Sequence, residues 1–316
     1  MRHFTSVNDI GDLKKALKVV FEVKKSPFEW AHLGKNKTMV LIFFNSSLRT
    51  RLSTQKAAMN LGMNTMVLNV NEDGWKMESE LGVIMDGDKP EHLREAIPVI
   101  GEYCDIIGVR SFARFESRDD DYQEKILNQF VEFSGVPVVS MEAATRHPLQ
   151  SFADLMTIEE LKNKPRPKVV LTWAPHPRAL PQAVPNSFVE WMQAADYDLV
   201  VTHPEGYELA PEFMKGVKVE YDQQRAFEGA DFIYAKNWAS YNNYGAILSK
   251  DRSWMVDAAK MALTNEARFM HCLPVRRNMI VSDEVIDSPA SVVIHEAANR
   301  EWSAQAVLRM ILEGMQ

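Results

Sequence analysis

The stretch IFFNSSLRTRLSTQKAAMNLG, from Ile42 to Gly62, decides the fold class because it joins a buried strand directly to a helix. Its apolar start completes a strand predicted over Thr38–Phe44. The later residues are good helix formers, and the helix that they predict ends near Gly62. A buried strand followed at once by a helix is typical of an α/β fold.

Two arginines occupy an unusual place in this stretch. Arg49 and Arg51 lie in the first turn of the predicted helix, where the helix dipole disfavours each cation by about 0.3–1 kcal/mol. A phosphate bound at the helix N-terminus would reverse this preference, with Ser47, Arg49 and Thr50 as donors. The alternative is a surface helix whose arginines pair with distant acids. It fits a single arginine better than the pattern Ser-x-Arg-Thr-Arg directly after a buried strand.

The alternation of strands and helices continues along the whole chain. Strands are predicted at Thr38–Phe44, Thr65–Val70, Asp105–Val109, Val136–Met141, Val169–Trp173, Asp198–Thr202, Lys218–Glu220, Phe232–Ala235, Phe269–Cys272 and Val292–His295. Helices are predicted at Leu93–Cys104, Asp121–Phe133, Phe152–Lys162, Ser187–Ala195 and Ser303–Gly314. This order predicts two doubly wound parallel-sheet domains, in which ligands bind at the carboxyl ends of the strands.

A domain boundary is predicted between residues 147 and 148. The chain there leaves a strand for a long helix, and the Pro/Lys-rich segment 162–168 opens a second set of strands. The predicted domains are residues 1–147 and 148–300. The final helix, residues 301–316, is assigned to the first domain, against which it could pack.

Composition and charge exclude several classes of function. Lys and Arg total 36 against 43 for Asp and Glu, a formal charge of −7, so nucleic acid is not an expected partner. The two cysteines, Cys104 and Cys272, fit a reducing cytoplasm. No apolar run approaches the length of a membrane span, and charges interrupt the N-terminal region, so neither membrane insertion nor export is expected.

The familiar cofactor and metal motifs do not occur in the sequence. It contains neither a Gly-x-Gly-x-x-Gly motif nor a P-loop, and HEAAN, residues 295–299, lacks the second histidine of a zinc-protease helix. No cofactor and no metal are therefore expected.

Polar side chains follow several predicted strands. Arg110 ends one, His147 and Gln150 lie just before a helix, and Arg300 follows the last predicted strand. Taken alone, such a histidine is more often structural and such an arginine is more often part of a salt bridge. Together, the strand ends predict a convergent binding site.

Five motifs occur in the order and spacing of the aspartate/ornithine carbamoyltransferase family, which the chain resembles over nearly its whole length. They are Ser47-Leu48-Arg49-Thr50-Arg51, Arg110, His147-Pro148-Leu149-Gln150, His271-Cys272-Leu273-Pro274 and Asn299-Arg300. The resemblance implies that the first domain binds carbamoyl phosphate and that the second binds the amine substrate. It implies no metal and no covalent intermediate.

The resemblance also implies roles for individual residues. Those implied to bind the phosphate are Ser47, Leu48, Arg49 and Thr50. Those implied to surround the carbamoyl group are Arg110, His147, Gln150 and Arg300, with backbone acceptors at Cys272 and Leu273. The negative charge that develops in the reaction would be stabilised by the expected catalytic residues, Thr50, Arg110, His147 and Arg300.

One departure from ordinary ornithine enzymes indicates the amine substrate. Those enzymes have an Asp-x-Trp-x-Ser-Met-Gly motif whose Asp receives the α-ammonium of ornithine. Aligning Trp238 and Ser240 puts Lys236 in the place of that Asp. A lysine would repel an α-ammonium, so the chain resembles the branch of the family that uses α-N-acylated ornithine.

Further roles follow from the resemblance to that branch. Its members are homotrimers in which a tryptophan reaches a neighbouring subunit's carbamoyl phosphate site, a role implied here for Trp75; the alternative is a core or interface tryptophan. The proline-spaced segment Trp173–Ser187 resembles the branch's knotted loop. The residues implied to bind the acylornithine are Pro90, Glu142, His176, Arg178, Lys236, Leu273, Arg276 and Arg277.

Succinyl and acetyl groups remain as candidates for the acyl group. Acetyl-specific relatives have a Glu where Pro90 stands here, and a Glu would repel a succinyl carboxylate. An alignment shifted by one residue, to Glu91, would reverse this inference. We expect transfer to the δ-amine of N-succinyl-L-ornithine in arginine biosynthesis, with N-acetyl-L-ornithine as the alternative. Lys236 weakens the case for plain ornithine or aspartate. A non-catalytic anion-binding relative is the remaining alternative.

Overall fold

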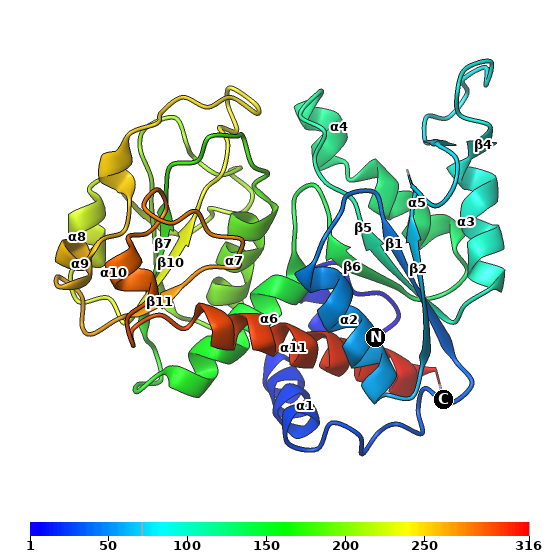
Figure 1. Cartoon of the computed structure of the whole chain (residues 1–316), viewed down its shortest axis with the longest axis horizontal. Helices are drawn as coiled ribbons and strands as arrows, with labels where there is room; N and C mark the ends of the chain where they lie inside the picture. The colour runs from blue at the N-terminus through cyan, green and yellow to red at the C-terminus, as the bar shows by residue number, and fades with distance from the viewer. Residues whose placement is uncertain (71, 316) are drawn as a thin grey trace. The chain divides into compact units, whose positions relative to one another are not determined.

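The computed structural model describes residues 1–70 and 72–315. The chain forms two compact units: unit 1 is Met1–Arg114, Asp119–Leu149 and Arg300–Gln316, and unit 2 is Phe115–Arg118 and Gln150–Asn299. Each unit contains a parallel β-sheet with helices beside it (Figure 1), which confirms the predicted α/β fold with two parallel-sheet domains. Asn71 and Gln316, the last residue of the predicted final helix, lie outside the described residues.

The sheet of unit 1 has four parallel strands in the order β2-β1-β5-β6. Their bounds are β1 (Thr38–Phe43), β2 (Asn64–Asn69), β5 (Ile106–Arg110) and β6 (Val138–Glu142). The short strands β3 (Met77–Glu78) and β4 (Glu91–His92) pair separately. Because β1, β5 and β6 are neighbours and parallel, their carboxyl ends lie along one edge of the sheet.

Both faces of this sheet are buried. Val40 and Ile42 of β1 pack in a core with residues of α3 and α5. Met39 and Leu41 point to the other face and are equally buried, which explains the continuous apolar run of this strand.

The helices of this part of the chain are η1 (Val7–Ile10), α1 (Leu13–Lys25), α2 (Arg49–Asn60), α3 (Leu93–Glu102), α4 (Arg118–Tyr122), α5 (Lys125–Phe133), α6 (Pro148–Leu161) and α11 (Val293–Gly314). Of these, α4, α6 and α11 contain residues of both units.

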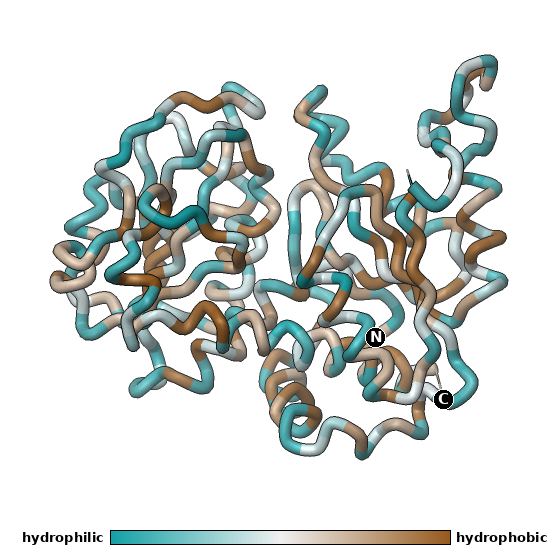
Figure 2. Tube along the Cα trace, viewed as in Figure 1, coloured by the Kyte–Doolittle hydropathy of each residue, from teal (hydrophilic) through white to brown (hydrophobic). Residues whose placement is uncertain are grey.

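Unit 2 repeats this plan with five parallel strands in the order β11-β10-β7-β8-β9. Their bounds are β7 (Lys168–Trp173), β8 (Asp198–Thr202), β9 (Lys218–Glu220), β10 (Phe232–Lys236) and β11 (Arg268–Met270). The helices are α7 (Ala183–Ala194), α8 (Gln223–Phe227), η2 (Arg252–Trp254), α9 (Ala258–Met261) and α10 (Asp283–Ile286). Phe188 of α7 packs on Tyr234 of β10, with ring centroids 4.2 Å apart. Figure 2 shows the hydrophobic residues concentrated along the strands.

One predicted strand is wrong. The other predicted strands occur within two residues of their expected ends, but Val292–His295 leads into helix α11. Only the start of this run has a sheet-like contact, since the N–H of Val292 donates to Phe269 O at 2.9 Å. The β preference of such a run is worth only about 1 kcal/mol and yields to packing. Here Val293, Glu296 and Arg300 are buried at helical spacing. Arg300 therefore lies on a helix and not at the expected end of a strand.

Two further features concern the chain as a whole. Among the residues that the structure describes, no helix has both the length and the apolar character needed to cross a membrane. The knot expected in the proline-spaced segment stays a prediction.

Candidate active site

The N-terminus of α2 has the features of an anion site. Its N-cap residue, Leu48, makes no side-chain capping bond, and the first turn contains no acid. Ser47 Oγ accepts a hydrogen bond from the N–H of Thr50 at 3.3 Å. Arg49 is half-buried in this turn, whereas Arg51 is exposed. The helix end therefore lacks the negative side chain that its dipole favours, which leaves room for a bound anion to supply that charge.

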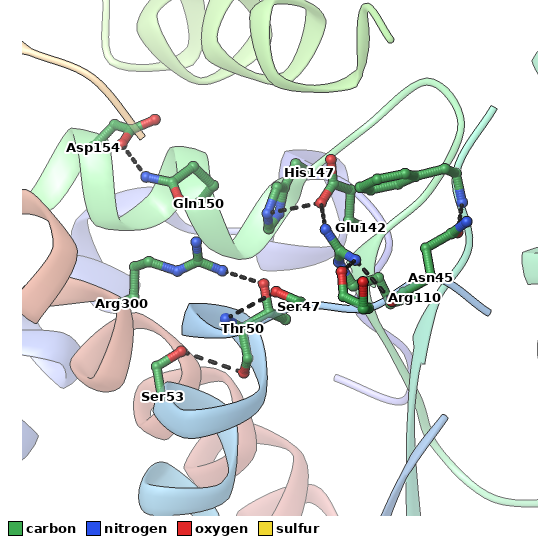
Figure 3. Close-up of polar contacts among 12 residues, drawn as sticks. Asn45, Ser47, Thr50, Ser53, Arg110, Glu142, His147, Gln150, Asp154 and Arg300 are labelled. Carbon is green, nitrogen blue, oxygen red and sulfur yellow. Dashed lines mark hydrogen bonds and ion pairs between the residues drawn. The ribbon is translucent and has the colours of Figure 1, made fainter. Parts of the chain in front are cut away.

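Arg300 reaches this turn from α11 (Figure 3). Its NH2 group donates to Thr50 Oγ1 at 2.5 Å, and both side chains are buried. At the other end of α2, Asn60 Nδ2 donates to Glu301 Oε1 at 2.8 Å and to Gln305 Oε1 at 3.0 Å. Both ends of α2 thus contact α11, which fixes the Arg300 guanidinium beside the anion-binding turn.

A buried ion pair ends the two neighbouring strands. Arg110 is the last residue of β5 and Glu142 the last of β6, and Arg110 NH2 lies 3.0 Å from Glu142 Oε2. His147 Nε2 lies 3.4 Å from the same oxygen (Figure 3). A buried guanidinium requires such a partner, because an unpaired buried charge is costly. The predicted contact of Glu142 with the substrate amide stays a prediction.

The rest of the Arg110 guanidinium is held by the loop after β1. Its NH1 group donates to the carbonyls of Asn45, at 2.8 Å, and Ser46, at 2.6 Å. Asn45 Oδ1 accepts from the N–H of Phe112 at 2.8 Å, and the Phe112 ring lies 4.1 Å from the guanidinium carbon. The buried Nε–H of Arg110 has no hydrogen-bond partner among the described residues, so it is available to a ligand. Sequence reasoning missed Asn45, whose only signal is its place directly after an apolar strand.

The strand ends of unit 2 carry a cluster of cations. Lys236 ends β10, His176 and Arg178 follow β7, and Arg276 follows β11, the three strands being neighbours in the sheet. The Nε–H of Arg276 donates to His176 Nε2 at 3.0 Å. Burial, and then the charges of Arg276, Lys236 and Arg178, hold the pKa of His176 below its usual value. A neutral histidine among three cations suits a ligand with carboxylate groups.

Arg277 has a different environment from Arg276. Its NH1 group lies 2.8 Å from Asp283 Oδ1, and its NH2 group lies 2.6 Å from Asp287 Oδ1. Hydrogen bonds to Asp287 and then Asp283 raise the pKa of Arg277. Two carboxylates therefore offset its charge and tie it to α10, and its predicted contact with the substrate stays a prediction.

The segment after β11 contains a buried thiol. Cys272 is 7% exposed, so its side chain is packed inside the protein. The N–H of the next residue, Leu273, donates to His271 Nδ1 at 2.8 Å. The predicted roles of the Cys272 and Leu273 carbonyls as acceptors stay predictions.

Trp75 and Pro90 lie on the segment between β2 and α3. Trp75 is 58% exposed, so it is not a core residue of this chain. Its Nε1–H donates to Glu91 Oε2 at 2.7 Å. This hydrogen bond already engages the Glu91 carboxylate. Pro90, the residue before Glu91, is exposed.

Gln150 brings in two acids that sequence reasoning missed. Its Nε2 donates to Asp154 Oδ1 at 2.7 Å and to Glu296 Oε1 at 3.3 Å. Asp154 follows Gln150 by four residues on α6, a spacing that places both on one helix face and could have indicated the contact. Glu296 gave no such signal. The described residues contain no group of three or more His, Cys, Asp or Glu arranged to hold a metal ion.

Comparisons with known proteins agree with this geometry. Residues 2–160 match the carbamoyl-P binding domain of the aspartate/ornithine carbamoyltransferases, and residues 181–311 match their Asp/Orn binding domain. The chain is 72% identical over 318 residues to N-succinylornithine carbamoyltransferase of Bacteroides thetaiotaomicron, covering 100% of each. It is 38% identical over 298 residues to N-acetylornithine carbamoyltransferase of Xylella fastidiosa, covering 87% of this chain and 88% of that one.

A solved structure has the same fold over nearly the whole chain. It is an N-acetyl-L-ornithine transcarbamylase in which a glutamate is replaced by proline, complexed with carbamyl phosphate and N-succinyl-L-norvaline. The TM-score is 0.93 at 35% identity, over 98% of this chain and 100% of that one.

Proposed function

The chain belongs to the aspartate/ornithine carbamoyltransferase family, and we propose that it transfers the carbamoyl group of carbamoyl phosphate to the δ-amine of N-succinyl-L-ornithine. The products are N-succinyl-L-citrulline and phosphate, in arginine biosynthesis. The full-length identity of 72% to an N-succinylornithine carbamoyltransferase carries the choice of substrate. The cations of unit 2 support it, because this substrate has two carboxylates.

Carbamoyl phosphate binds to unit 1 in this proposal. The phosphate occupies the N-terminus of α2, where Arg49, Ser47 and Thr50 supply donors in addition to the helix dipole. Arg110 and Arg300 donate to the carbamoyl oxygen, together with the Thr50 hydroxyl. The buried Nε–H of Arg110 and the position of Arg300 beside Thr50 support these roles.

The reaction forms one C–N bond and breaks one C–O bond. The neutral δ-amine attacks the carbamoyl carbon, and negative charge develops on the carbonyl oxygen, where preorganised donors stabilise it. The C–O bond to phosphate then breaks, and the electron pair leaves with the phosphate. The amine proton passes to the departing phosphate, because none of the residues proposed to surround the carbamoyl group is an Asp or a Glu.

Most of the residues proposed to bind the acylornithine belong to unit 2. Lys236 takes the place at which an ordinary ornithine enzyme would hold the α-ammonium, and it accepts a substrate whose α-nitrogen is an uncharged amide. Arg178 and Arg276, with His176, bind its carboxylates. Pro90 leaves room for the distal carboxylate of the succinyl group. The proline variant of the acetyl enzyme, complexed with a succinyl compound, supports this role.

Assembly and location complete the proposal. A homotrimer in which Trp75 enters a neighbouring subunit's site is proposed, since the indole is exposed on the single chain. A cytoplasmic location is proposed as well, in accord with Cys104 and Cys272, neither of which forms a disulfide.

A substrate comparison tests the proposal. Purified protein is assayed for phosphate release from carbamoyl phosphate with ornithine, aspartate, N-acetylornithine and N-succinylornithine. We expect the highest kcat/KM with N-succinylornithine. A higher value with N-acetylornithine would refute the succinyl assignment alone, whereas no release with any amine would refute carbamoyl transfer.

A further inference from the structure

Two buried carboxyl groups meet the side-chain amide of Gln150. Gln150 lies in the first turn of α6, and its Nε2 donates to Asp154 Oδ1 at 2.7 Å and Glu296 Oε1 at 3.3 Å. Figure 3 shows the first of these contacts. The second oxygen of Glu296 accepts from the backbone N–H of His271 at 2.9 Å. All four residues are at most 1% exposed.

These contacts determine which way the Gln150 amide faces. A side-chain amide has donors only on its nitrogen and acceptor sites only on its oxygen. Because carboxyl oxygens accept from Nε2, the amide oxygen must point away from both acids. This oxygen is buried and has no hydrogen-bond partner among the described residues. A buried acceptor in that state costs about 1–3 kcal/mol, so a ligand with N–H donors fits it.

The two acids also contact each other. The Glu296 carboxyl hydrogen-bonds to that of Asp154, and a bond between two carboxyl groups requires a proton on one of them. Burial and then the charge of Asp154 raise the pKa of Glu296 well above its usual range. The raised pKa favours a proton on the pair, which the N–H donors of Gln150 and His271 face.

We propose that Asp154 and Glu296 are positioning residues that fix the Gln150 amide oxygen as an acceptor for the NH2 group of the carbamoyl substrate. The inference rests on the proposed function. Glu296 additionally holds the backbone of His271, directly before the two carbonyls assigned to the same NH2 group. The acids thus act through Gln150 and this segment, without touching the substrate.

Acetyl phosphate provides a direct probe, since it has a methyl group in place of NH2 and retains the phosphate. The dissociation constants of carbamoyl phosphate and acetyl phosphate are measured for the full-length protein. Their ratio reports recognition of the NH2 group and is insensitive to changes in phosphate binding. We expect Gln150→Ala and Asp154→Ala each to reduce the preference for carbamoyl phosphate about tenfold, the effect of one buried hydrogen bond.

Further variants separate positioning from stability. Asp154→Asn should keep most of the preference, because its oxygen still accepts from Gln150 and its NH2 donates to Glu296. Glu159→Gln is the matched control: Glu159 lies on α6 and contacts Lys162 and Tyr197 instead. If Asp154→Ala does not fold, the double variant Asp154→Leu, Glu296→Met replaces the pair with apolar side chains, which commonly preserves folding.

A double-mutant cycle that combines Asp154→Ala with Gln150→Ala tests whether the acids act through Gln150. Positioning through Gln150 predicts that Asp154→Ala, or the apolar pair, changes the preference little once Gln150→Ala is present. Additive losses, or equal losses for both phosphates, would overturn the inference. A wild-type protein that binds neither phosphate would instead refute the proposed function.

Discussion

At the scale of single residues, the first turn of α2 separates two arginines that look equivalent in the sequence. Arg49 is half-buried at the proposed phosphate site, and Arg51, two residues later, is exposed. Arg49→Ala should therefore weaken carbamoyl phosphate binding by about 10- to 100-fold, the loss of a charge-assisted hydrogen bond. Arg51→Ala is the control and should change the dissociation constant little. Similar losses in both variants, measured by calorimetry, would contradict a specific site at Arg49.

The acyl preference also belongs to the residue scale, at Pro90. Pro90→Glu would add a carboxylate beside Glu91, whose own carboxylate is engaged by Trp75. Repulsion of the succinyl carboxylate should lower kcat/KM for N-succinylornithine and raise it for N-acetylornithine, with carbamoyl phosphate affinity nearly unchanged. Pro90→Gln is the uncharged control. Equal losses with both acyl substrates would mean that Pro90 only shapes the loop.

At the scale of elements, the position of α2 depends on how the helix ends. Gly62 follows its C-cap with φ +81°, and a Cβ there would lie 2.1 Å from the Ala31 carbonyl oxygen. Gly135, after α5, has φ +71° but nothing within 4 Å of such a Cβ. Both alanine variants meet the strain of the left-handed region, about 1–2 kcal/mol, whereas only Gly62→Ala adds a backbone clash.

This difference gives a stability prediction for α2. Gly62→Ala should lower the free energy of unfolding by about 1–3 kcal/mol more than Gly135→Ala, the range typical of overpacking. Urea denaturation of the two variants measures the difference. If both lose the same stability, the chain near Ala31 adjusts and the close approach is not a constraint.

At the scale of the whole molecule, the exposed Trp75 bears on assembly. Trp75→Ala and Arg49→Ala proteins should each be nearly inactive if every site needs both residues. If Trp75 serves a neighbouring subunit, mixed trimers contain some sites with both residues intact, and activity should partly return. Phosphate release after subunit exchange measures this. Exchange without recovered activity would show that each site is complete within one chain.

The apolar pattern of the sequence predicts the fold class, which the structure confirms. Parallel strands buried on both faces are continuous apolar runs, so strands such as Asp198–Thr202 can be located from the apolar pattern of the sequence. The parallel order then places residues that follow neighbouring strands at one edge. This order predicts that Arg110 belongs to a convergent site, whereas Glu142 follows only from the family resemblance, as a contact of the acylornithine. The ion pair between the two is not predicted.

Which side chains meet depends on long-range packing. The run at Val292–His295 favours a strand locally, but the buried face of α11 makes it the start of a helix. Gln150 and Glu296 are 146 residues apart, and no local pattern indicates their contact. Local propensities are worth about 1 kcal/mol or less, whereas burying an unpaired polar or charged group costs more. Long-range packing therefore determined how the amide of Gln150 faces and where Arg300 lies.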